Sequence, residues 1–210
     1  YTKALKLYKQ CDAIEATILG KNHIWRMTTI ANEGYCYSQL SDSTNAIKCF
    51  EAHQAACQQL YNLECDAAMN TLFALGHEYY NHQFENHYPK ALNAYFQAYE
   101  LAKNLNDSIN YNSSLYCISL CYFSQSQENN GDEQGKYLEN AEVFVRELRN
   151  DNEEDRYLKN LIYDNLANFY NKKSEEYLQD SITLQQALDY SQKPWNISKK
   201  PDADQGVKDY

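Results

Sequence analysis

Apolar, small and aromatic residues recur along this chain at spacings of three and four, which places them on one face of an α-helix. In the first pattern, a large apolar or aromatic residue is followed four positions later by a small residue and three positions after that by a tyrosine. Its four occurrences are Ile30, Gly34, Tyr37; Leu72, Gly76, Tyr79; Leu115, Ser119, Tyr122; and Tyr163, Ala167, Tyr170. The small residues lie 42, 43 and 48 positions apart. This regularity predicts a helical repeat in which each small side chain lets a neighbouring helix approach closely.

A second pattern lies between these segments and spans two turns of another helix face. It occurs as Ala4, Tyr8, Cys11; Ala46, Phe50, His53; Ala91, Tyr95, Ala98; and Ala141, Val145, Leu148. Antiparallel pairs of such helices bury their apolar faces only when pair stacks on pair, so the sequence predicts an all-α solenoid over residues 1–192. Residues 193–210 are expected to be a linker or C-terminal tail. The polar run "SQSQENNGDEQGK", residues 124–136, is predicted to be an exposed loop.

The two patterns together resemble the longer variant of the tetratricopeptide repeat. The resemblance implies a right-handed superhelical solenoid of antiparallel helix pairs, with repeats of about 42 to 48 residues and a concave groove. It also implies that residues one step around the helix from the small residue line that groove. The residues predicted to bind a peptide there are Asn32, Tyr35, Asn70, Phe73, His77, Tyr80, Tyr116, Leu120, Phe123, Asp164 and Asn168.

Aromatic faces hold aliphatic or cationic side chains, and asparagine offers a donor and an acceptor to a peptide backbone, so this set suits an extended peptide. The alternative is that Phe73, Tyr116, Leu120 and Phe123 only pack against neighbouring helices.

Other candidate chemistry is weaker. His77 and His82 are five residues apart, which puts their rings on different sides of a helix, whereas a zinc site on one helix needs a spacing of four. The seven cysteines include no Cys-x-x-Cys pair, and Cys117 and Cys121 are expected to be small buried residues. We find no phosphate-binding loop and no catalytic arrangement, so the sequence predicts neither a metal, nor a cofactor, nor an enzyme.

Charge bears on the choice of partner. The net charge is −10, and residues 106–210 carry nineteen Asp or Glu against eleven Lys or Arg. Such a chain lacks the basic footprint of a nucleic-acid-binding protein, and its apolar runs are too short for a membrane span. The acidity is either ordinary solvated surface or a surface for a basic partner.

The run "YTKALKLYKQCDAIEATILGKN", the repeat opening on "WRMTTIANEGYCY" and the segment "YPKALNAYFQAYELAKNLND" resemble the amino-terminal repeats of Tonsoku-like proteins. That resemblance implies a nuclear scaffold in replication-coupled DNA repair that binds a histone H3 tail and a large repair partner. The alternative is a cytoplasmic tetratricopeptide adaptor for a polarity, motor or signalling protein. A lysine-rich ligand would favour the scaffold, and an apolar or acidic ligand the adaptor.

Overall fold

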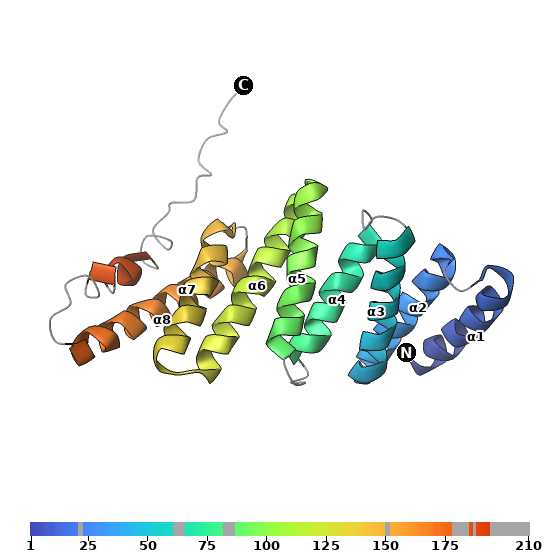
Figure 1. Ribbon diagram of the computed structural model, residues 1–210, viewed down its shortest axis with the longest axis horizontal. Coiled ribbons are helices and arrows are strands. Elements are labelled where there is room, and N and C mark those ends of the chain that lie inside the picture. Colours follow the sequence, from blue (N-terminus) through green and yellow to red (C-terminus); the bar gives the residue numbers. More distant parts are fainter. Residues whose placement is uncertain are drawn as a thin grey trace, which may run out of the picture. The chain divides into compact units, whose positions relative to one another are not determined.

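The computed structural model describes residues 1–20, 23–60, 66–81, 87–149, 152–177, 185–186 and 188–193, and the regular structure within these ranges is helical. The helices are α1 (Thr2–Ile18), α2 (Ile24–Gln39), α3 (Ser43–Leu60), α4 (Asp66–Asn81), α5 (His87–Asn104), α6 (Ser108–Glu128), α7 (Gly131–Glu147) and α8 (Glu153–Tyr177). Residues 188–193 are also helical. The predicted all-α fold of paired helices is therefore confirmed (Figure 1).

The chain divides into unit 1, Tyr1–Ser114, and unit 2, Leu115–Tyr210. The predicted boundary between a repeat domain, 1–192, and a tail, 193–210, stays a prediction, because residues 194–210 lie outside the described ranges.

Consecutive helices of unit 1 pack against one another from α1 through α5, and α2 also contacts α4. The predicted small residues lie at these contacts. A Cβ atom added to Gly34 would come within 2.7 Å of the Phe50 ring, and one added to Gly76 would collide with the Tyr95 ring. Phe50 and Tyr95 are 0% and 2% exposed. Both patterns found in the sequence therefore meet at the same place, an aromatic ring of one helix seated over a glycine of its partner.

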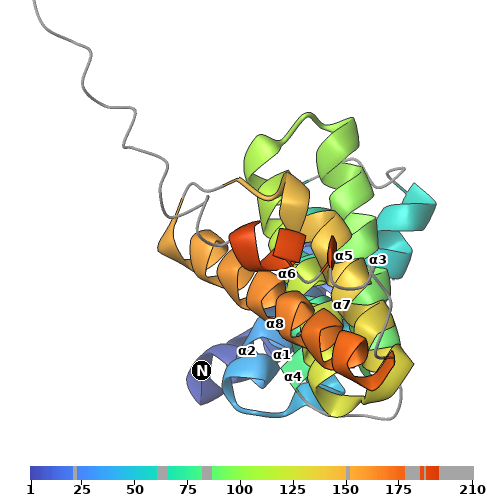
Figure 2. The same ribbon diagram turned by 90° about the vertical axis from the view of Figure 1, so that its left-hand side faces the viewer.

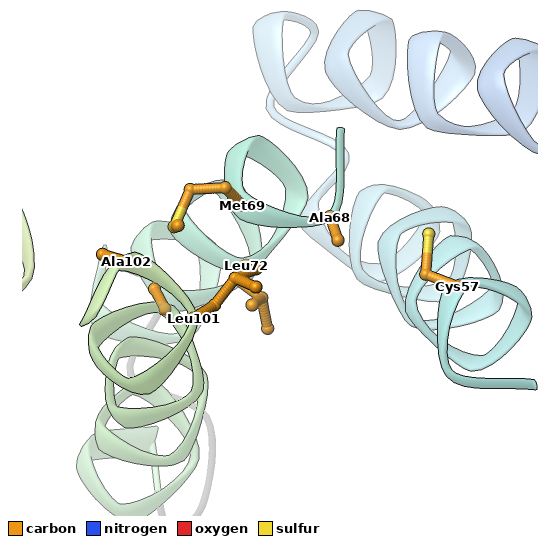
Figure 3. Close-up of a cluster of buried hydrophobic side chains, with 7 residues drawn as sticks. Cys57, Ala68, Met69, Leu72, Leu101 and Ala102 are labelled. Carbon is orange, nitrogen blue, oxygen red and sulfur yellow. The ribbon is translucent and has the colours of Figure 1, made fainter. Parts of the chain in front are cut away.

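A compact part of the unit 1 core shows how three helices share their apolar faces (Figure 3). Met69 and Leu72 of α4 lie between Cys57 of α3 and Leu101 of α5. Phe73 and Tyr111 pack against this cluster while remaining partly exposed. Leu75 and Tyr79, farther along α4, are buried as well, so the predicted core face of α4 is confirmed.

Two turns of unit 1 use the same sequence, Leu-x-Asp-Ser-x-Asn, at residues 40–45 and 105–110. In each turn the second residue has a positive φ, 59° at Ser41 and 54° at Asn106. The aspartate then begins the next helix: its Oδ1 accepts the backbone N–H three residues later, at 3.2 Å in the first turn and 3.1 Å in the second. An aspartate at this position satisfies a helix N–H group that has no partner within the helix.

Unit 2 corrects one prediction. Residues 124–136 are not an exposed loop, because α6 runs to Glu128 and α7 begins at Gly131. Ser126 is fully buried and its hydroxyl donates to the Phe123 carbonyl at 2.6 Å, so a polar residue is accommodated within the helix. Gly135, expected in that loop, lies against the Phe169 ring, where a Cβ would collide. It is a close helix contact that the repeat pattern missed.

Helices α7 and α8 are antiparallel neighbours, and they lie side by side in both views (Figure 2). Tyr170 donates a hydrogen bond to Glu139, and Lys173 pairs with Asp132 at 3.2 Å. The predicted small residues Ser119 and Ala167 are buried, with exposures of 0% and 5%.

Candidate functional site

The open face of α2 and the open face of α4 correspond residue by residue. The burial of α2 leaves Trp25, Thr28, Asn32 and Tyr35 at least partly exposed, at spacings of three and four. The 42-residue offset between Gly34 and Gly76 pairs Thr28 with Asn70, Asn32 with Ala74, and Tyr35 with His77, which are also exposed or half-buried. We call these residues, Trp25, Thr28, Asn32, Tyr35, Asn70, Ala74 and His77, the α2–α4 strip.

The strip is polar but carries no carboxylate, ammonium or guanidinium group. Asn32 and Asn70 provide amide groups that both donate and accept hydrogen bonds. The Thr28 hydroxyl donates to the Ile24 carbonyl at 3.0 Å and offers its oxygen as an acceptor. Trp25 adds a large aromatic surface, being 66% exposed. A neutral surface of this kind matches the alternating donors and acceptors of a peptide backbone better than it matches a strongly charged ligand.

Trp25 was missed in the sequence, although a signal was available. It lies three positions before Thr28, so it continues the same helix face toward the start of α2. The His23 ring lies edge-on to it, with centroids 5.5 Å apart. His23 also accepts a hydrogen bond from the Trp25 backbone N–H at 3.3 Å, which begins the helix.

The predicted aromatic residues of unit 1 are held by the second helix of their own pair. The Tyr35 ring is edge-on to Phe50 at 5.0 Å, and the Tyr80 ring is edge-on to Tyr88 at 6.1 Å. Phe73 lies 6.4 Å from Tyr95 and is half-buried against the core. Packing within the helix pair therefore covers much of the Phe73 and Tyr80 rings. Tyr35, at 37% exposure, keeps an open surface.

His77 is exposed as a residue, but its ring is anchored. The imidazole is edge-on to the Tyr95 ring at 5.6 Å, and its Nδ1 is 2.9 Å from the Tyr95 hydroxyl oxygen. Burial of the ring against Tyr95 lowers the pKa of His77 below its usual 6.5, with Glu78 acting weakly in the opposite direction. His77 is therefore mostly neutral at pH 7, and because Nδ1 is engaged with Tyr95, Nε2 is the ring nitrogen left for a ligand.

The other predicted residues belong to unit 2. Tyr116 and Leu120 on α6 are half-buried. Phe123 is 9% exposed, which leaves little of its ring for a ligand. Asp164 and Asn168 on α8 are exposed and lie one helical turn apart.

The histidines and cysteines considered as metal ligands are not brought together in the described part of the chain. No group of three or more His, Cys, Asp or Glu side chains there is placed to hold a metal ion. His82 lies outside the described residues, and His87 begins α5. Cys117 and Cys121 are buried, as expected, and burial raises the pKa of the Cys121 thiol. Among the helices described, none is long and apolar enough to cross a membrane.

No family model matches this chain, and no curated protein matches it in sequence. Solved structures do resemble it. A variant form of the TPR-like repeats of a protein assigned as a kinesin light chain of Podosopora anserina has a TM-score of 0.58 and 16% identity, covering 94% of this chain and 86% of that one. Another structure of those repeats has a TM-score of 0.57 and 16% identity, covering 95% and 89%. BtubC (BKLC) from P. vanneervenii has a TM-score of 0.56 and 15% identity, covering 100% and 79%.

These likenesses show the fold, which is that of the TPR-like helical repeats. The tetratricopeptide part of the sequence prediction is therefore confirmed. The narrower resemblance to Tonsoku-like proteins is not tested by them and stays a prediction, as does the placement of a ligand on the predicted residues.

Proposed function

We propose that this chain is a non-enzymatic protein-interaction scaffold that binds an extended peptide along the α2–α4 strip. One observation carries the proposal: equivalent positions of two contacting helices present exposed amide, hydroxyl and aromatic groups without charge. Stacked repeats place equivalent residues at regular intervals, so successive helices can contact successive parts of one peptide. The peptide contacts predicted at Asp164 and Asn168, in unit 2, stay predictions.

The proposed ligand is a histone H3 tail, and the proposed setting is replication-coupled DNA repair in the nucleus, together with a large repair partner. Support comes from the resemblance to Tonsoku-like repeats, the acidic excess of residues 106–210 and the exposed Asp164 carboxylate. The second candidate is a cytoplasmic adaptor for a polarity, motor or signalling protein. The neutrality of the α2–α4 strip favours it, because a lysine-rich tail would find no opposite charge there.

A fluorescent H3 tail peptide titrated against the chain tests the proposal. We expect Asn32→Ala combined with Asn70→Ala to weaken binding by about tenfold, since each lost hydrogen bond is worth about 0.5–1.5 kcal/mol. Asn104→Ala, an exposed change at the end of α5, is the matched control and should leave affinity unchanged.

Equal binding by the double variant and the wild type would remove the α2–α4 strip from the mechanism. If the H3 tail does not bind at low salt, while a neutral or apolar peptide binds and is lost in the double variant, the adaptor function replaces the histone function.

A further inference from the structure

A cluster of aromatic and acidic side chains on α7 and α8 holds a lysine of the same chain. Tyr163 and Tyr170 lie two turns apart on α8, and each is 5% exposed. The ring of Tyr190, in the helical residues 188–193, stacks on Tyr170 with centroids 5.5 Å apart and planes inclined by 3°. It also stacks on Tyr163, at 6.4 Å.

Lys193 lies three residues after Tyr190, on the same helix face. Its Nζ is 4.7 Å from the centre of the Tyr163 ring and 4.1 Å from that of Tyr190. The same Nζ lies 2.9 Å from a carboxylate oxygen of Glu142, on α7. From α7 and α8 the ammonium group therefore meets one aromatic face, Tyr163, and one carboxylate, Glu142, while Tyr190 of its own segment adds a second ring; an aromatic face beside a carboxylate is a favourable place for a lysine.

The energetics favour a cation in this place. The Glu142 side chain is only 9% exposed, so its charge is largely removed from water. Its other carboxylate oxygen is 3.8 Å from Arg146, a longer contact with a side chain that is 64% exposed. Loss of Lys193 would leave the Glu142 carboxylate with its weaker partner, and a buried carboxylate without a close cation is costly.

The segment that supplies this lysine rests on α7 and α8 through one face. Leu188 is 51% exposed, and Asp189, Ser191 and Gln192 are exposed too. Ser191 donates to the Leu188 carbonyl at 2.8 Å within the segment, and Gln185, which precedes it, donates to Asp189 at 2.7 Å. These bonds hold the helical shape but add no contact to α7 or α8. By contrast, the second helices α3 and α5 of the earlier pairs each bury a full apolar face.

We propose that Glu142, Tyr163 and Tyr170 form a binding site for a helical peptide that carries an aromatic residue three positions before a lysine, and that residues 188–193 occupy this site as a displaceable ligand in cis. The site does not depend on the peptide function of the α2–α4 strip. Its partner class follows from its present occupant: a lysine for the Glu142 carboxylate and the Tyr163 ring, and an aromatic ring for the stack on Tyr170.

A tethered ligand competes through its effective concentration, which is about millimolar for a short connection. A free peptide with the same contacts therefore binds weakly while residues 188–193 occupy the site. Its apparent affinity equals the intrinsic affinity multiplied by the fraction of molecules whose site is open. Removing the contacts of the segment should restore the intrinsic affinity.

The test uses a labelled peptide of residues 185–193, QQALDYSQK, titrated by fluorescence anisotropy against the whole chain. We expect the Tyr190→Ser, Lys193→Ala double variant to bind it about tenfold more tightly than the wild type does. Lys172→Ala, which removes an exposed lysine of α8, is the matched control and should bind as the wild type does. Adding Glu142→Gln to the double variant should remove most of this increase in affinity. A peptide in which alanine replaces the lysine should bind the double variant no more tightly than it binds the wild type.

Hydrogen exchange of the wild-type chain gives a second readout that needs no variant. Saturating peptide should speed exchange at residues 188–193 and leave α7 protected. The proposal is overturned if the double variant, folded by circular dichroism, binds no more tightly than the wild type, or if Glu142→Gln changes nothing. Should the double variant fail to fold, unchanged exchange at 188–193 under saturating peptide overturns it equally.

Discussion

Gly76 and Tyr95 show how closely single residues constrain each other in this protein. The Tyr95 ring lies where a side chain at position 76 would begin, and its hydroxyl is engaged with His77. The ring is 2% exposed and has little room to move away. One glycine thus sets the separation of α4 and α5 and, through Tyr95, the position of a strip residue.

We expect Gly76→Ala to destabilise the chain by about 1–3 kcal/mol, although alanine is the better helix former. The measurement is the unfolding midpoint in urea. Because the collision is with the Tyr95 ring, Gly76→Ala combined with Tyr95→Leu should cost less than the two changes added together. Strict additivity would mean that the ring does not cause the loss. Ala55→Leu, which adds bulk at an exposed position of α3, should change the midpoint little.

The buried His53 makes stability depend on pH. It is 1% exposed, its Nδ1 lies 3.0 Å from the Thr71 hydroxyl oxygen, and burial lowers its pKa below 6.5. As pH falls, the unfolded chain takes up the proton first. The contribution of the neutral ring is thus complete above about pH 6.5 and is lost as pH falls from there toward the lowered folded-state pKa.

Stability measured by urea unfolding at several pH values between 7 and 5 should therefore decline toward pH 5, and His53→Asn should make the decline shallower. A smaller slope should persist in this variant, since the pKa of His77 is lowered as well. An identical slope in the two proteins would rule out His53 as the cause.

At the scale of elements, the helices of unit 1 are separated by turns that are themselves encoded. The two Leu-x-Asp-Ser-x-Asn turns both place a residue at positive φ, and both then begin a helix with an aspartate cap. In each, the asparagine side chain also donates to the aspartate, at 2.7 Å and 2.6 Å. Hydrogen bonds among residues close in sequence therefore mark the start of the next helix in both turns.

Replacing either cap should have the same effect. We expect Asp42→Ala and Asp107→Ala each to lower the free energy of unfolding by about 1 kcal/mol. Asp107→Asn should retain most of the stabilisation, because asparagine also caps helices well. The two alanine variants should be nearly additive, since the turns share no residues. If only one of the two alanine variants loses stability, tertiary packing and not the aspartate cap holds the other turn in place.

At the scale of the whole molecule, the neutral hydrogen-bonding groups of the α2–α4 strip and the acidic excess lie in different parts of the chain. The α2–α4 strip is neutral, while the acidic excess lies in residues 106–210, where Asp164 is exposed. If a basic tail is the ligand, charge should chiefly raise its association rate, and backbone hydrogen bonds should set its position.

Binding of an H3 tail peptide should therefore weaken as salt rises, yet persist in part once exposed charges are screened. Asp164→Asn should reduce the salt dependence, whereas Tyr35→Ala should weaken binding by a similar factor at every salt concentration. Titrations at several ionic strengths separate the two effects. A salt dependence unchanged by Asp164→Asn would place the electrostatic contact elsewhere.

The sequence by itself determined the helix pairs and the close contacts at Gly34 and Gly76, because side chains three and four apart share a helix face whatever surrounds them. Only the tertiary structure decided which neighbour covers each face. It buried Phe123, left Trp25 exposed and turned Gly135 from an expected loop residue into a contact with Phe169. It also brought Lys193 to Glu142, 51 residues away in sequence. Spacing along one helix carries no information about such a pairing, because packing between helices brings the two side chains together.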